Sequence, residues 1–401
     1  MTNFDVQAAR SQFPALQEDQ VFLDNAGGSQ TLGTVIESIK DYLIKSNTQF
    51  GGGYKASKAS ASRYNEGVEA GAQFLNAQKD EIAYGSSTTQ LLRNLSFTFQ
   101  FQEGDEIIVS SIDHEANIAP WKNLASRLKL VLKPWTPQQK STNPKLLPEE
   151  LKSLLSPKTR LVTCTHASNV LGTIHDVKAI AEVVHTVPNA LLCVDGVAYA
   201  PHRPLDVKEL GVDFYVLSWY KIFGPHVSML YGSRKAQEQM HSLGHFFNPH
   251  DTLEQKISLG SGYYELVQSI PAILSYLSPS GAGSWDTSAT HESLLQETLL
   301  KYLNSKPEII TIYGERSVDS NLRLPVISFK VAGRDSGEIV QALEQSTNFG
   351  FRWGAFYSNT LVNDFLGLGA DGVIRVSMAH YNTLDEIKGF IEVFDAEISK
   401  H

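Results

Sequence analysis

The sequence has few cysteines, no excess of basic residues and no long apolar run. Cys164 and Cys193 are the only cysteines among 401 residues, and both lie inside strand-like apolar runs. We therefore expect buried, reduced core residues and not a disulfide framework. The net charge of −9 argues against nucleic acid or an anionic membrane as the main partner. No run reaches the length of a membrane span and the N-terminus has no secretory pattern, so we expect a cytoplasmic protein.

Apolar runs of strand length alternate with segments of helical periodicity. We expect strands at 80–84, 106–110, 128–132, 161–165, 190–195, 212–218 and 227–231. This alternation predicts an α/β fold, a mainly parallel sheet with helices on both faces. The segment 281–401 has its own helices and strands and predicts a smaller α+β domain. The expected division is a large domain over 20–270 and a small domain formed by 1–19 and 271–401.

A lysine and an aspartate follow two of these apolar runs. Lys221 comes after the run that starts at Val212, and its aromatic and aliphatic neighbours favour a desolvated amine with a lowered pKa. Asp195 ends an earlier run, where a carboxylate needs a cationic partner. Pyridoxal phosphate (PLP) needs this combination, a lysine for the Schiff base and a carboxylate for the pyridinium nitrogen. A surface lysine and a helix-capping or salt-bridged aspartate are the alternatives.

Other polar residues stand where a cofactor and its substrate need them. Ser87 and Thr88 open a helix after Gly85, where free N–H groups and hydroxyls bind phosphate, or where they simply cap the helix. His114 follows a strand and can stack on a flat ring or move protons, although a lone histidine often has a structural role. Arg375 lies within an alternating strand, where a carboxylate clamp and a structural ion pair are equally supported.

Motifs spread over nearly the whole chain resemble those of class V, fold-type I PLP enzymes, specifically the cysteine desulfurase and selenocysteine lyase group. They are 23–27, 87–89, 113–121, 166–173, 194–196, 213–225, and Arg375 with 380–383. The resemblance implies a PLP enzyme in which Lys221 carries the cofactor. Asp195 pairs with the pyridine nitrogen and His114 stacks on the ring as a catalytic group. The residues expected to bind the cofactor phosphate are Ser87, Thr88, Ser218 and Tyr220. Those expected to bind the substrate are Asn169, Arg375, Ala26 and Tyr357. The family also implies a homodimer, in which Ser261 reaches the partner's phosphate.

Two residues depart from the desulfurase pattern. Tyr357 stands about where desulfurases carry the thiol that accepts sulfur, and Ala198 replaces a glutamine near the cofactor. The segment 155–238 resembles the fungal decarboxylative aldolases of the same family more closely. We therefore predict a lyase acting at Cβ of a small L-amino acid, with β-decarboxylation of L-aspartate and coupling to an aldehyde co-substrate, and without a metal. The alternatives are a C–S or C–Se lyase that releases alanine, a transaminase, and a non-catalytic protein that kept the fold.

Overall fold

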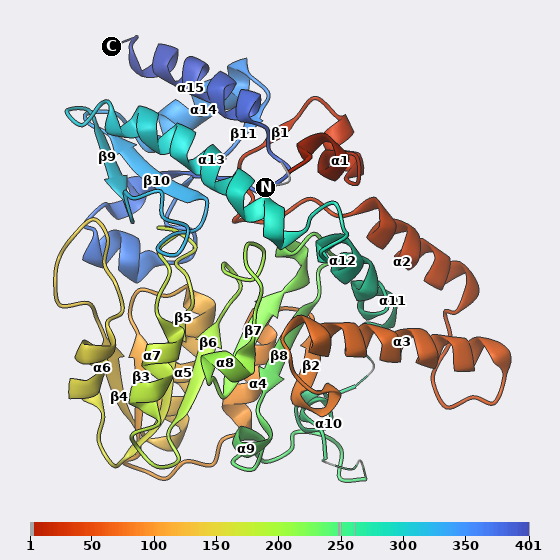
Figure 1. The fold of residues 1–401 in the computed structure, drawn as a ribbon. Coiled ribbons are helices and arrows are strands. Elements are labelled where there is room, and N and C mark those ends of the chain that lie inside the picture. Colours follow the sequence, from red (N-terminus) through yellow and green to blue (C-terminus); the bar gives the residue numbers. More distant parts are fainter. Residues whose placement is uncertain (1–3, 248, 250, 261, 401) are drawn as a thin grey trace.

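A seven-stranded sheet forms the middle of the molecule (Figure 1). The computed structural model describes residues 4–247, 249, 251–260 and 262–400. The strands in spatial order are β2 (Ile82–Gly85), β8 (Ser228–Gly232), β7 (Phe214–Ser218), β6 (Leu191–Asp195), β5 (Thr159–Thr165), β3 (Glu106–Ser110) and β4 (Val131–Trp135). β8 runs antiparallel to both of its neighbours, and the other pairs are parallel. The expected α/β fold is confirmed.

Helices cover both faces of this sheet because the buried strands are apolar on both sides. α4 (Thr88–Thr98), α5 (Ala119–Leu128) and α10 (Leu253–Ile257) pack with Ile107 and Val109. α3 (Lys55–Phe74), α6 (Pro148–Leu154) and α7 (Val177–Val184) pack with the intervening Ile108. This is the two-residue alternation of a strand. Cys164 and Cys193 face opposite layers, and both are free and fully buried, as predicted.

A second, four-stranded antiparallel sheet has the order β12 (Arg352–Gly354), β13 (Val373–Ser377), β10 (Val326–Val331) and β9 (Ile310–Tyr313). It packs with α13 (Trp285–Asn304), α14 (Ser336–Ser346) and α15 (Leu384–Ile398), which lie together at the top of Figure 1. Phe13 and Phe356 lie outside the expected large domain. They nevertheless belong to the same apolar cluster as residues of the large sheet. The domain division at residue 270 stays a prediction.

Shorter elements complete the chain. They are α1 (Val6–Arg10), α2 (Gly33–Lys45), α8 (Val207–Leu210), α9 (Arg234–Gln237), α11 (Tyr264–Val267), α12 (Ile270–Leu277), the 3-10 turns η1 (Pro14–Gln17), η2 (Lys79–Glu81), η3 (Glu115–Asn117), η4 (Trp219–Lys221) and η6 (Gly369–Asp371), and the π-helix η5 (Thr360–Phe365). No helix in the described part of the chain is long and apolar enough to cross a membrane.

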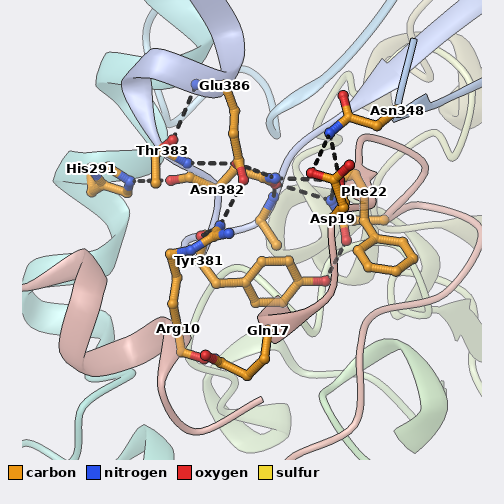
Figure 2. Close-up of polar contacts among 12 residues, drawn as sticks. Arg10, Gln17, Asp19, Phe22, His291, Asn348, Tyr381, Asn382, Thr383 and Glu386 are labelled. Carbon is orange, nitrogen blue, oxygen red and sulfur yellow. Dashed lines mark hydrogen bonds and ion pairs between the residues drawn. The ribbon is translucent and has the colours of Figure 1, made fainter. Parts of the chain in front are cut away.

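The N-terminal segment is held against the small sheet. β1 (Val21–Phe22) pairs in parallel with β11 (Phe349–Gly350). Figure 2 shows the polar contacts beside this pair: Arg10 binds Glu386 at 2.8 Å, and Asn382 donates to the Phe22 carbonyl at 3.1 Å. The Asn25 amide donates to Asn382 at 3.1 Å. A bridge between Asp24 and Ser377, with a hydrogen bond of 2.9 Å from the Asn25 amide to the Ser377 carbonyl, places residue 24 beside the end of β13.

Several strand boundaries differ from the prediction by one to three residues, and two of these differences have a clear local cause. The strand expected at 128–132 begins only at Val131, because α5 continues to Leu128 and Lys129 then adopts a left-handed conformation with φ of 54°. The strand expected at 80–84 begins at Ile82, because residues 79–81 form a 3-10 turn.

Candidate active site

A recess opens at the carboxyl ends of β5, β6 and β7. Ligands of open α/β sheets bind at this edge. Among the predicted residues, those that line the recess are Ser87, Thr88, His114, Asn169, Asp195, Ser218, Tyr220 and Lys221. Thr89, Ala116, Thr165, Ala167, Val197 and Ala198 complete the lining. The strand ends therefore bring together groups that are far apart in the sequence.

Lys221 is the buried amine of the recess. It ends the 3-10 turn η4, directly after β7, and is 8% exposed. In the part of the chain that the structure describes, its ammonium has no hydrogen-bond or ion-pair partner. Burial, followed by the charge of Arg375, lowers the pKa of Lys221 to about 8, against the opposing effects of Asp195 and Asp24. A lysine in this state has an accessible neutral amine near neutral pH.

Asp195 is the last residue of β6. This strand pairs with β7, and Lys221 lies in the turn that follows β7. The Oδ1 of Asp195 accepts a hydrogen bond from the Val197 N–H at 2.9 Å, and among the described residues its Oδ2 has no partner. Burial raises the pKa of this carboxyl, while the Val197 N–H and the charge of Lys221 oppose the rise. A buried carboxylate with one free oxygen in a recess fits the pyridinium nitrogen of PLP.

A cluster of hydroxyl groups also belongs to the recess. The Thr88 hydroxyl lies 2.6 Å from that of Ser218, which lies 2.7 Å from that of Ser228. Ser87 caps α4 by accepting from the Gln90 N–H at 3.1 Å, and the first N–H groups of a helix have no intrahelical partner. Free N–H groups, the helix dipole and hydroxyls together fit a phosphate. The sequence analysis missed Ser228, which is placed here by its register opposite Ser218.

His114 lines the recess as the N-cap of η3. Its Nδ1 accepts the Ala116 N–H at 3.1 Å, so the proton of the neutral ring is on Nε2. Burial, then the charges of Lys221 and Arg375, lowers the pKa of His114 to about 4. His114 is therefore a neutral ring with one N–H to donate.

Tyr357 is tied to the His114 turn without lining the recess. Its ring is 70% exposed and its centroid lies 5.5 Å from that of His114, while its carbonyl accepts the Glu115 N–H at 2.7 Å. Phe356 and Tyr357 both have left-handed backbones, with φ of 51° and 58°. Such conformations cost non-glycine residues on the order of 1 kcal/mol each, so the surrounding contacts hold this loop in place.

Arg375 sits behind the recess and already has partners. Its guanidinium donates to the Asn169 carbonyl at 3.0 Å and to Asp24 at 2.5 Å, and it stacks 3.7 Å from the ring centre of Phe356. Asn169 holds the same loop, since its amide donates to the Phe356 carbonyl at 2.9 Å. The sequence analysis did not anticipate Asp24 as the partner of Arg375.

The remaining predicted residues have separate positions. Tyr220 stacks on His226, with ring centres 4.8 Å apart, on the wall of the recess. Ala26 lies beside Asp24, and its N–H donates to the Ser377 hydroxyl at 2.9 Å, outside the recess lining. Ser261 lies outside the described residues.

Comparisons with known proteins show the family and the fold of the chain. The aminotransferase class-V family profile matches residues 21–390. The chain is 52% identical to an aminotransferase-like protein, FGM3, of Gibberella zeae over 97% of this chain and 98% of that protein. It is 40% identical to a cysteine desulfurase-like protein, ustD, of Aspergillus flavus, over 99% and 91% of the two chains. A cysteine desulfurase of Thermococcus onnurineus has the same fold, with a TM-score of 0.89 at 22% identity over the full length of both chains. The chain therefore belongs to the class V aminotransferase family of PLP-dependent enzymes, in its cysteine desulfurase-like branch.

Proposed function

We propose that the enzyme removes the β-carboxylate of L-aspartate and joins the resulting carbon nucleophile to an aldehyde. The β-carboxylate leaves as CO₂, and the electron pair of the broken bond stays on Cβ. That pair forms a bond to the aldehyde carbon, whose oxygen takes up a proton. The product is a γ-hydroxy amino acid. Bound PLP supplies the electron sink that makes such a leaving group at Cβ feasible.

The absence of a usable thiol carries this proposal. Desulfuration through a persulfide needs an accessible thiolate. Cys164 and Cys193 are fully buried on opposite faces of the sheet, and burial raises the pKa of both thiols well above the ordinary value. Tyr357 stands on the loop beside His114, and a phenol cannot form a persulfide. Carboxylate needs no acceptor group on the protein, so it is the leaving group that fits these residues.

The residues of the recess have distinct tasks in this reaction. Lys221 would hold PLP, and its amine would take the proton from Cα of the substrate. Asp195 would keep the pyridine nitrogen of the cofactor protonated. His114 offers its Nε2 proton within the recess. Asn169 and Arg375 orient the α-carboxylate. Ala198 leaves space on the wall where a larger side chain would enter the recess.

We also propose that the enzyme is a homodimer. Large apolar side chains stand in solvent on the single chain: Ile44 is 72% exposed, Phe246 95% and Phe247 68%. Phe246 and Phe247 lie side by side, with ring centres 5.3 Å apart, and an exposed apolar cluster favours a protein interface. Analytical ultracentrifugation of the PLP-loaded enzyme measures its mass, and a monomer at micromolar concentration contradicts this part of the proposal.

A side-by-side product analysis tests the reaction. The PLP-loaded enzyme is incubated with L-aspartate, L-cysteine or cysteine sulfinate, each with and without a panel of aldehydes, and the products are identified by mass spectrometry. We expect a new γ-hydroxy amino acid only with aspartate and an aldehyde. Alanine with released sulfide from cysteine, and no consumption of aspartate, would support the C–S lyase alternative. Lys221→Ala is the control that removes the amine.

A further inference from the structure

Two arginines stand directly opposite each other on the small sheet. Arg352 on β12 pairs in register with Arg375 on β13, in an antiparallel ladder. Side chains at such positions share one face, with Cβ atoms about 4.5–5.5 Å apart. Like charges at directly opposite positions destabilise a sheet unless an anion lies between them. This arrangement therefore indicates a place where carboxylates bind.

Asp24 supplies one such carboxylate. Its Oδ1 lies 2.5 Å from the Arg375 guanidinium, and its Oδ2 lies 3.7 Å from that of Arg352. Both guanidiniums also approach the ring of Phe356, at 3.7 Å for Arg375 and 5.7 Å for Arg352. The contacts of Figure 2 hold the segment that carries Asp24 against the loop that follows β13. Two positive charges thus face one negative charge, and one positive charge is left over.

The leftover charge is on Arg352. The Arg375 side chain is 2% exposed and donates to both Asp24 and Asn169, whereas the Arg352 side chain is 56% exposed. In the part of the chain that the structure describes, Arg352 has no hydrogen bond from its side chain, and the long contact to Asp24 is its one ion pair. Arg352 is therefore the guanidinium that a ligand can reach.

The arginine pair adjoins the recess of Lys221. Arg375 binds the carbonyl of Asn169, whose side chain lines that recess. A continuous chain of contacts thus leads from Asn169 in the recess through Arg375 and Asp24 to the exposed guanidinium of Arg352.

We propose that Arg352 binds the side-chain carboxylate of a dicarboxylic amino-acid substrate. This inference rests on the proposed function, because it assigns the group that recognises the carboxylate to be lost. A guanidinium that is half exposed binds a carboxylate less firmly than a buried one. Weak binding suits a group that must later depart as CO₂, since a tightly paired carboxylate resists losing its charge.

Ligand binding to the PLP-loaded enzyme tests this role without turnover. α-Methyl-L-aspartate lacks the Cα proton, so it binds to the enzyme but cannot react further. 2-Aminoisobutyrate is the same molecule without the second carboxylate. Absorbance titration of the cofactor gives a dissociation constant for each. We expect Arg352→Gln to weaken the binding of α-methylaspartate about tenfold and to leave that of 2-aminoisobutyrate unchanged. Arg352→Lys, which keeps the charge, restores part of the loss.

The control is Arg234→Gln, at an arginine that is 67% exposed and paired with Asp80 far from the recess; it changes neither constant. Equal weakening of both ligands, or no weakening, by Arg352→Gln overturns the assignment. So does a wild-type enzyme that binds the two ligands equally well. If the dicarboxylate preference depends on Arg352 but aspartate releases no CO₂, the assignment of Arg352 stands and the proposed reaction falls.

Discussion

The amine of Lys221 is expected to load PLP with a pH dependence centred near 8. An ordinary lysine has a pKa of 10.5, and burial with the charge of Arg375 lowers that of Lys221 to about 8. At pH 7 the neutral fraction of an amine is then about 10%, against about 0.03% for an unperturbed lysine. Since only the neutral amine attacks the PLP aldehyde, the protein accelerates loading about 300-fold at this pH.

The assay mixes cofactor-free enzyme with PLP between pH 6 and 10 and follows the long-wavelength absorbance. A free lysine derivative assayed in parallel is the reference, and its rate keeps rising about tenfold per unit up to about pH 10. Because the neutral fraction grows as the pH rises, the raw rate increases about tenfold per unit below pH 8 and levels off above it. Arg375→Gln removes one cause of the lowered pKa and moves the plateau to higher pH. A raw rate that still rises tenfold per unit between pH 8 and 10 refutes the reasoning.

Three substitutions test other parts of the structure. Thr88→Val removes a hydroxyl of the phosphate cluster, so we expect about tenfold weaker PLP retention by equilibrium dialysis; unchanged retention would place the phosphate elsewhere. Gly71→Ala places a Cβ 2.0 Å from the Tyr84 hydroxyl, so chemical denaturation is expected to show a loss of about 1–3 kcal/mol in the free energy of unfolding. Gly53→Ala meets nothing within 4 Å and is the control; equal effects of the two contradict the packing argument. Tyr357→Val is expected to be less stable than Tyr357→Gly by about 1–2 kcal/mol, because the φ of 58° disfavours a β-branched residue, and the reverse order in thermal unfolding contradicts this backbone assignment.

The sequence alone predicted the strands of the large sheet and the polar residues that follow them. Lys221 and Asp195 were found because apolar runs end abruptly in polar residues, and parallel strands present their carboxyl ends at one edge. The contact between Asp24 and Arg375 could not be predicted from local patterns, because 351 positions separate the two residues in the sequence. Only the folded small sheet brings them together. The strand expected at 128–132 was wrong in its start, because helix α5 uses the same apolar residues up to Leu128. Local sequence patterns thus predicted helices and strands, whereas contacts between residues far apart in the sequence could be found only in the structure.

The fate of the β-carboxylate is the measurement that tests the central claim most directly. The PLP-loaded enzyme is given L-aspartate labelled with carbon-13 at the β-carboxylate, or in a parallel sample at the α-carboxylate, together with an aldehyde. The account predicts labelled CO₂ from the β-labelled sample alone, in step with the formation of an amino acid that keeps the α-carboxylate. Label released from the α-carboxylate, or no labelled CO₂ from either sample while cysteine yields alanine and sulfide, would contradict it.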